Sequence, residues 1–140
     1  MKTTINLVLT LIIGGFVLMS FSLSNDSPAN PDGDRWLAPA SAKNLKNPYS
    51  GKSSISKGKS IYKTRCTVCH GEKGKGDGPA GKALNPPAAD HSSALVQDQT
   101  DGELFWKVSE GRGPMVGWKL ILSEEDRWHV VNYLRTLKAK

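Results

Sequence analysis

The two cysteines of this chain are separated by only two residues, and a histidine follows directly in the run Cys66-Thr67-Val68-Cys69-His70. Two cysteines are too few for the disulfide scaffolds that hold many small secreted domains together. Residues 71–93 and 111–122 are two long stretches rich in glycine and proline. Loops of this length inside a small domain need something to pack around.

The spacing of the two thiols and the histidine is typical of covalent attachment of a c-type haem. Each cysteine forms a thioether with a vinyl group of the porphyrin, and the histidine becomes an axial ligand of the iron. One helical turn presents both sulfurs to neighbouring vinyl positions and brings the next side chain under the iron. We therefore expect one haem c, bound through Cys66 and Cys69, with His70 as a metal ligand.

The motif has three other interpretations. A structural zinc site needs two further ligands, and the candidates, His91 and His129, lie 38 positions apart instead of at finger-like spacing. A thioredoxin-type dithiol needs a βαβ context, which this chain does not offer. A structural disulfide leaves His70 and the long loops unexplained. Haem attachment accounts for all of these features.

Residues 1–24 have the pattern of an export signal. Lys2 precedes an apolar run of 19 residues from Ile5 to Leu23, and small residues flank Leu23 at the expected cleavage site. We expect cleavage near Ser24; the alternative is an uncut membrane anchor, since the run is long enough to span a bilayer. Covalent haem attachment belongs to extracytoplasmic proteins, so the signal supports the haem independently.

Residues 25–54 are rich in Pro, Ser, Asn, Asp and Lys, and their prolines break any long helix. We expect a linker or extended arm whose apolar positions, between Trp36 and Tyr49, pack on the domain. The domain itself is expected over residues 55–140.

Three helical patterns organise the folded part, and strand signals are nearly absent. The first covers residues 56–65 and leads into Cys66, and the second covers residues 101–110 with Gly111 as its stop. The last is capped by Ser123 and has acidic residues in its first turn. Its apolar side chains recur at helical spacing, at Val130, Tyr133, Leu134 and Leu137. The sequence predicts an all-α fold.

Several motifs follow one another in an order that resembles the monohaem class I cytochromes c over residues 56–137. They are Gly58 and Tyr62 ahead of Cys66-Thr67-Val68-Cys69-His70-Gly71, then Gly74-Lys75-Gly76-Asp77-Gly78-Pro79, then Gly111-Arg112-Gly113-Pro114-Met115, and finally Asp126, Trp128, Tyr133 and Leu134. The resemblance implies a small cytochrome c fold, with three to four helices wrapped around one covalently bound haem. It also implies that the first and last helices cross, with Gly58 and Tyr62 against Val130 and Tyr133. The missing side chain at Gly58 would let the two backbones approach.

The resemblance and elimination both favour Met115 as the second axial ligand. Met1 and Met19 belong to the signal, so Met115 is the only thioether of the mature domain, in a loop after His70. A core methionine that fills a gap is the alternative role. His91 and His129 are the rival ligands, and either would give bis-histidine ligation.

The resemblance implies further contacts around the haem. A proline carbonyl accepts the other ring proton of the axial histidine, and Pro87 fits the loop order best, with Pro79 and Pro86 as alternatives. Trp118 resembles an aromatic residue that lines the haem edge, although a plain core tryptophan fits equally well. Arg112 is close enough in sequence to pair with a propionate; a solvated arginine is the alternative.

Charge is distributed unevenly along a chain whose formal net charge is +6. Residues 43–82 contain ten Lys or Arg residues and two acidic ones, whereas residues 83–140 contain seven basic and eight acidic residues. A basic face could steer an acidic redox partner toward the haem edge, and an ordinary solvated lysine face is the alternative. The lysines concerned are Lys57, Lys59, Lys63, Lys73, Lys75 and Lys82. No nucleic-acid binding motif is present.

These features lead us to expect a one-electron carrier outside the cytoplasm, not an enzyme, with His/Met-ligated haem c and no catalytic residues. It would act as a monomer or as a subunit of a complex, and would meet a membrane only through an uncut anchor. Two alternatives stay open: an electron-transfer subunit of a larger oxidoreductase, docked through the arm, and a small haem peroxidase or gas sensor with an open sixth position.

Overall fold

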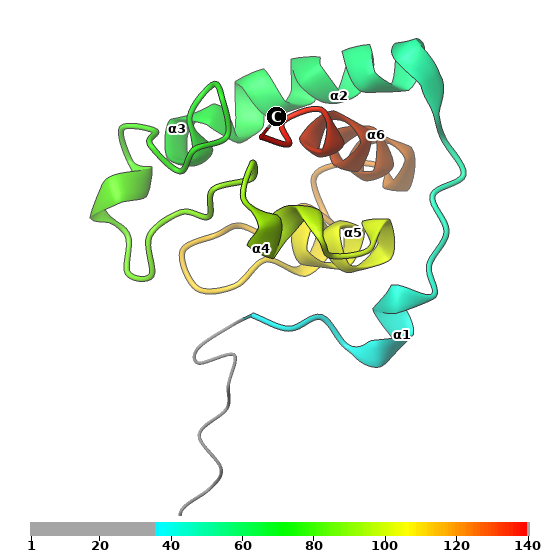
Figure 1. Cartoon of the computed structure of the whole chain (residues 1–140), viewed down its shortest axis with the longest axis horizontal. Helices are drawn as coiled ribbons and strands as arrows, with labels where there is room; N and C mark the ends of the chain where they lie inside the picture. Colours follow the sequence, from blue (N-terminus) through cyan, green and yellow to red (C-terminus); the bar gives the residue numbers. More distant parts are fainter. Residues whose placement is uncertain (1–35, 140) are drawn as a thin grey trace, which may run out of the picture. The chain divides into compact units, whose positions relative to one another are not determined.

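In a computed structural model of the chain, residues 36–139 are described, and their regular secondary structure is entirely helical. The three long helices are α2 (Gly51–Arg65), α5 (Asp101–Glu110) and α6 (Glu124–Arg135). The short elements are α1 (Ala40–Lys43), α3 (Thr67–His70), the 3-10 turn η1 (Gly81–Ala83) and α4 (Ala94–Gln97). Helix α6 contacts both α2 and α5 (Figure 1). The all-α prediction is confirmed.

The packing of α2 on α6 is the largest helix contact, and it depends on Gly58. A Cβ atom built on Gly58 would lie only 1.9 Å from the carbonyl oxygen of His129. Tyr62, one turn further along α2, is fully buried and packs with Val130 and Tyr133 of α6. The predicted contact between the first and last helices is therefore present, because the absent side chain lets the backbones touch.

Local capping signals set the ends of α5 and α6. Helix α5 begins with a capping box, in which Thr100 Oγ1 accepts from the Glu103 N–H and the Glu103 carboxylate accepts from the Thr100 N–H. It ends at Gly111, as predicted. At the start of α6, Ser123 Oγ accepts from the Asp126 N–H at 3.0 Å. The capping box was absent from the sequence prediction; the Ser123 cap was expected.

The arm before α2 is part of the folded unit. Trp36 contacts Trp106 of α5, with ring centroids 5.9 Å apart. Asn47 and the Tyr49 carbonyl both hydrogen-bond the side-chain amide of Asn132, and the Tyr49 ring packs on the second core cluster. That cluster consists of Val96, Leu104, Phe105, Trp128 and Val131. The arm packs on the domain, and the compact unit begins at Trp36.

The first helix also begins earlier than the pattern over residues 56–65 indicated, since α2 starts at Gly51. Residues 51–54 are glycine, lysine and serine, which carry no apolar period, so only packing reveals that they are helical. Within residues 36–139 no helix has the length and apolarity needed to cross a bilayer. The expected signal or anchor, residues 1–24, lies outside the described range.

Candidate functional site

The attachment motif begins at the junction between α2 and α3 and continues through α3. Cys66 terminates α2, and its carbonyl accepts hydrogen bonds from the backbone N–H groups of Cys69 (3.2 Å) and His70 (2.9 Å). This single turn places the two sulfurs in succession and ends on the histidine, as the motif predicted. Both thiols are free, and both side chains are partly buried. Burial raises the pKa of the Cys66 thiol to about 12, and Cys69 adds to this shift.

The imidazole of His70 is buried, and one of its nitrogens is already engaged. His70 Nδ1 lies 3.0 Å from the carbonyl oxygen of Ala89. Because a carbonyl can only accept, Nδ1 carries the proton and Nε2 keeps the lone pair that a metal requires. Burial also lowers the pKa of His70, with the Ala89 hydrogen bond acting in the opposite direction. The donor set therefore fits a haem iron bound through Nε2.

The predicted identity of this carbonyl is wrong. Neither Pro87 nor the alternatives Pro79 and Pro86 accepts the His70 proton; Ala89, two positions beyond Pro87, does so. All three prolines are exposed. The acceptor lies in the loop that contains the predicted prolines, but its position depends on where the backbone returns, at the hydrogen bond from the His91 N–H to the Gly74 carbonyl.

His91, a rival ligand in the sequence analysis, lies against His70 itself. The two imidazole rings are stacked, with centroids 4.0 Å apart and planes inclined by 22°. Burial, with His70 close by, lowers the pKa of His91 to about 3, so its ring is neutral at physiological pH. A residue stacked on His70 is poorly placed to bind a metal from the side opposite to His70.

His129, the other rival, lies between α2 and α6 with both ring nitrogens engaged. Its Nδ1 is 2.7 Å from Ser54 Oγ, and its Nε2 is 3.0 Å from the Glu125 carboxylate. The residue is 3% exposed. These contacts give His129 a structural role in joining the two helices.

Met115 is presented by a short turn that folds back on α5. Its N–H and carbonyl exchange hydrogen bonds of 3.1 Å with the carbonyl and N–H of Arg112. Gly111, at φ +68°, starts the turn, and the Trp118 N–H donates to the Val108 carbonyl at 3.0 Å where the turn ends. The turn is tied down at both ends, and Met115 is partly buried.

Trp118 and Arg112, the two other residues predicted to contact the haem, lie in different parts of the domain's packing. Trp118 is partly buried and packs, like Cys66, on the core cluster around Tyr62. Arg112 lies over the ring of Trp36, with its guanidinium carbon 5.4 Å from the ring centroid. This cation–π contact links the Met115 turn to the arm.

The lysines of the predicted basic face are exposed, and two of the six pair with carboxylates. Lys57 lies 3.2 Å from Glu125, and Lys75 lies 3.6 Å from Asp90. Both pairs are solvent-exposed and therefore weak, so they reduce the positive charge of the face only in part.

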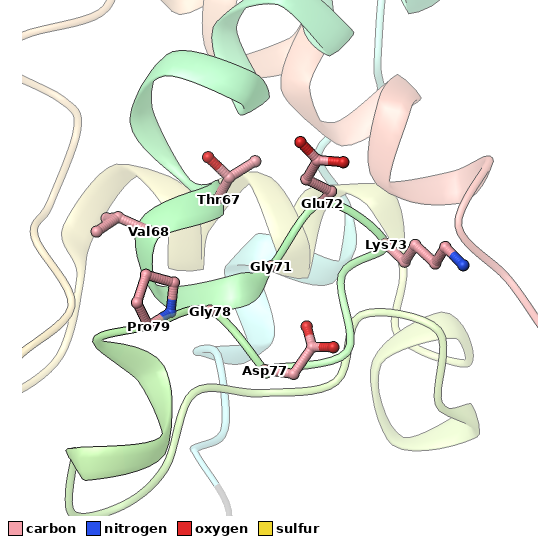
Figure 2. Close-up of a pocket in the computed structure, with 8 residues that line it drawn as sticks. All are labelled: Thr67, Val68, Gly71, Glu72, Lys73, Asp77, Gly78 and Pro79. Atoms are coloured by element: carbon pink, nitrogen blue, oxygen red, sulfur yellow. The ribbon is translucent and has the colours of Figure 1, made fainter.

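An open pocket of about 660 Å³ lies against α3 and the glycine-rich loop of residues 71–79 that follows it (Figure 2). Its lining residues are Thr67, Val68, Gly71, Glu72, Lys73, Asp77, Gly78 and Pro79. The lining includes neither thiol, nor His70, nor Met115, so we do not assign this pocket to the haem.

Comparison with known proteins decides the family. The family model described as cytochrome c matches residues 55–138, more than half of the chain, from within α2 to beyond α6. The chain belongs to the cytochrome c family. The resemblance seen in the sequence is thus confirmed, and with it a fold built to carry electrons on covalently attached haem.

One curated relative of this cytochrome c domain is the thiosulfate dehydrogenase of Stutzerimonas stutzeri (strain A1501). The two are 34% identical over 88 residues, which are 59% of this chain but only 27% of the relative. The chain therefore spans about a quarter of the length of that protein.

Three solved structures are similar to the domain. The KustC0563 c-type cytochrome is 27% identical with a TM-score of 0.52, over 59% of this chain and 98% of its own. Cytochrome CL of Methylophaga aminisulfidivorans MPT is 25% identical with a TM-score of 0.50, over 69% and 59%. The Kuenenia stuttgartiensis reducing HAO-like protein complex Kustc0457/Kustc0458 is 23% identical with a TM-score of 0.59, over 67% and 48%, and shows the shared fold alone.

Sequence reasoning missed the surroundings of His70 in two respects. It did not identify Ala89 as the hydrogen-bond acceptor, and it treated His91 as a rival ligand. No sequence signal indicates which backbone carbonyl will accept the His70 proton. A histidine in the loop that returns to His70, however, can be a neighbour of His70 as well as a competitor for the metal.

Proposed function

We propose that this chain carries single electrons on one haem c, bound through thioethers to Cys66 and Cys69, with His70 and Met115 as the axial ligands. The observation that carries the proposal is the hydrogen bond from His70 Nδ1 to Ala89. It commits one ring nitrogen to the protein and leaves the other for iron, directly after two free thiols at attachment spacing.

The surroundings of the histidines support Met115 as the second ligand. His91 is stacked on His70, and His129 has both nitrogens engaged by Ser54 and Glu125. Met115 has a neutral, soft thioether and sits on a turn that is anchored to α5 at both ends. A thioether opposite an imidazole is the ligation that raises the potential in cytochromes c.

Bound haem would supply an iron that alternates between the ferric and ferrous states. The residues of the chain hold it, tune it and shield it. Cys66 and Cys69 fix the porphyrin covalently, and the Ala89 carbonyl increases the basicity of His70. If His70 and Met115 both hold the iron, no coordination position would be left for a substrate, so an electron carrier is favoured over a peroxidase or gas sensor.

Redox partner proteins follow from this function. The exposed lysines of α2 and of the glycine-rich loop favour an acidic docking surface on the partner, and electrostatic steering of this kind weakens as salt is added. We place the protein outside the cytoplasm, in a periplasm-like compartment, because an export signal precedes a haem attachment motif.

A second candidate function keeps the electron transfer but makes the domain a subunit of a larger oxidoreductase. It is favoured by the similarity to part of a thiosulfate dehydrogenase. Under this hypothesis the purified chain would co-elute with a larger partner on size exclusion, and would be reduced by the partner's substrate only in its presence.

The deciding experiment is an optical spectrum of the purified holoprotein in both redox states. We expect a low-spin ferric spectrum with the weak sulfur-to-iron absorption in the near infrared, and poor binding of carbon monoxide by the ferrous form. A missing band with ready carbon monoxide binding would favour the peroxidase or sensor. A missing band with closed, low-spin iron would instead overturn Met115 as the ligand.

A further inference from the structure

Two contacts constrain the orientation of the His70 ring: a hydrogen bond to Ala89 and the stacked ring of His91. The hydrogen bond from His70 Nδ1 to Ala89 fixes one atom of the His70 ring, but a ring held at one atom can still rock about that bond. The flat face of His91, with its centroid 4.0 Å away and nearly parallel, lies where it blocks this motion. The two contacts together define the plane of the ring.

His91 is itself held from three directions. Its N–H donates to the Gly74 carbonyl, its carbonyl accepts from Gln97 Nε2 at 2.6 Å, and its Nδ1 lies 3.4 Å from the hydroxyl of Tyr62. The Tyr62 ring also meets the His91 ring edge-on, at 5.8 Å. Both side chains are buried, so solvent does not compete for these contacts.

The proton positions in this group follow from its acceptors. The hydroxyl of Tyr62 donates to the Gly71 carbonyl at 3.0 Å, which uses its only proton. His91 Nδ1 therefore donates to the Tyr62 oxygen, and His91 is a neutral imidazole in one fixed tautomer. A flat ring with a donor at this position is what histidine supplies and leucine lacks.

We propose that His91 is a positioning residue for the axial ligand: it fixes the plane of the His70 ring, and Tyr62 in turn fixes His91. This inference rests on the proposed function, in which His70 binds haem iron. In low-spin ferric haem, the plane of an axial imidazole determines how unpaired spin is distributed over the porphyrin. The orientation of His70 is therefore readable in the paramagnetic spectrum of the oxidised protein.

The experiment uses oxidised holoprotein carrying His91→Leu, His91→Phe or Tyr62→Phe, with His129→Leu as the matched control at a second buried histidine. For each, the hyperfine-shifted haem methyl resonances and the electron paramagnetic g values are recorded together with guanidinium unfolding. We expect His91→Leu to change the order or spread of the methyl shifts, and His91→Phe to change them less, because phenylalanine keeps the flat ring but loses the hydrogen bond to Tyr62. Tyr62→Phe should move the shifts in the same direction as His91→Leu, but less.

The control separates positioning from stability. His129→Leu should lower the unfolding midpoint while leaving the methyl pattern unchanged. The role of His91 is overturned if His91→Leu keeps the wild-type pattern, or if His129→Leu disturbs it equally. Should His91→Leu fail to fold, an unchanged pattern in Tyr62→Phe overturns it instead. A wild-type protein without low-spin ferric iron would refute the proposed function itself, and the role of His91 with it.

Discussion

Gly58 of α2 touches the backbone of α6 at His129: a Cβ atom added to Gly58 would lie 1.9 Å from the His129 carbonyl oxygen and 2.5 Å from its carbonyl carbon. A backbone carbonyl cannot move aside as the end of a side chain can. The contact therefore fixes the separation of the two helices that flank the Tyr62 cluster, on which Cys66 and Trp118 pack.

Gly58→Ala should destabilise the domain by about 3 kcal/mol or more, because α2 and α6 must separate to admit the methyl group. Helix propensity alone predicts the opposite sign, a gain of about 1 kcal/mol. Guanidinium unfolding followed by haem absorbance measures the difference. Ser53→Ala, at an exposed position of the same helix, is the control and should gain roughly 0.5 kcal/mol or less. A neutral or stabilising Gly58→Ala would contradict the contact.

The covalent link between haem and chain can be tested directly. After denaturation in acid and organic solvent, the haem should remain with the polypeptide, because thioethers survive conditions that break axial ligation. Cys66→Ala and Cys69→Ala should each impair maturation, measured as haem stain per unit of protein. Release of free haem from the wild-type chain would rule out attachment.

Met115→Ala should open the sixth position. We expect loss of the near-infrared band, a high-spin or newly ligated ferric iron, tighter carbon monoxide binding and a lower reduction potential, because thioether ligation raises the potential. If Met115 only fills space, truncation should instead cost about 2 to 5 kcal/mol of stability and leave the iron spectrum intact. Leu120→Ala, at a fully exposed position after the same turn, is the control and should change neither the iron spectrum nor the stability.

Asp90 should give the stability a small acid-dependent component. Its carboxylate accepts from the N–H (2.8 Å) and hydroxyl (2.6 Å) of Ser92, and Lys75 lies close by. The Ser92 hydrogen bonds, with a contribution from Lys75, lower the pKa of Asp90 below its ordinary value of 3.8. A lowered pKa stabilises the fold above the ordinary value, and this stabilisation is lost as the pH falls through the folded pKa.

Asp90→Asn should therefore lower the unfolding free energy at pH 6, by less than about 1 kcal/mol since the group is exposed. The difference from wild type should shrink as the pH is lowered below about 4. Asp98→Asn, at the end of α4, serves as the comparison. A difference that is the same at pH 6 and pH 3 would exclude ionisation of Asp90 as its cause.

Mass spectrometry of the native protein tests the expected export signal. The mature N-terminus should lie near Asn25, in a soluble extracytoplasmic fraction, because small residues precede this position at the end of the apolar run. An intact Met1 recovered from washed membranes would identify residues 1–24 as an anchor instead.

The sequence alone determined the local features of this protein. The attachment motif fits within one helical turn, α5 covers the predicted residues 101–110, and Ser123 caps α6, because each depends on neighbours in the chain. The contact at Gly58 was also predicted, although through resemblance to a family and not from periodicity. The family match over residues 55–138 confirms that resemblance.

Only the tertiary structure decided what surrounds His70. Ala89 and His91 follow it by about twenty residues and reach it because the loop returns to Gly74 through a backbone hydrogen bond. Trp36 packs on the domain as the sequence indicated, but only the structure shows that its partners are Trp106 and Arg112. Local patterns encode helix ends and motif spacing, whereas contacts between distant segments depend on loop paths that no local preference specifies.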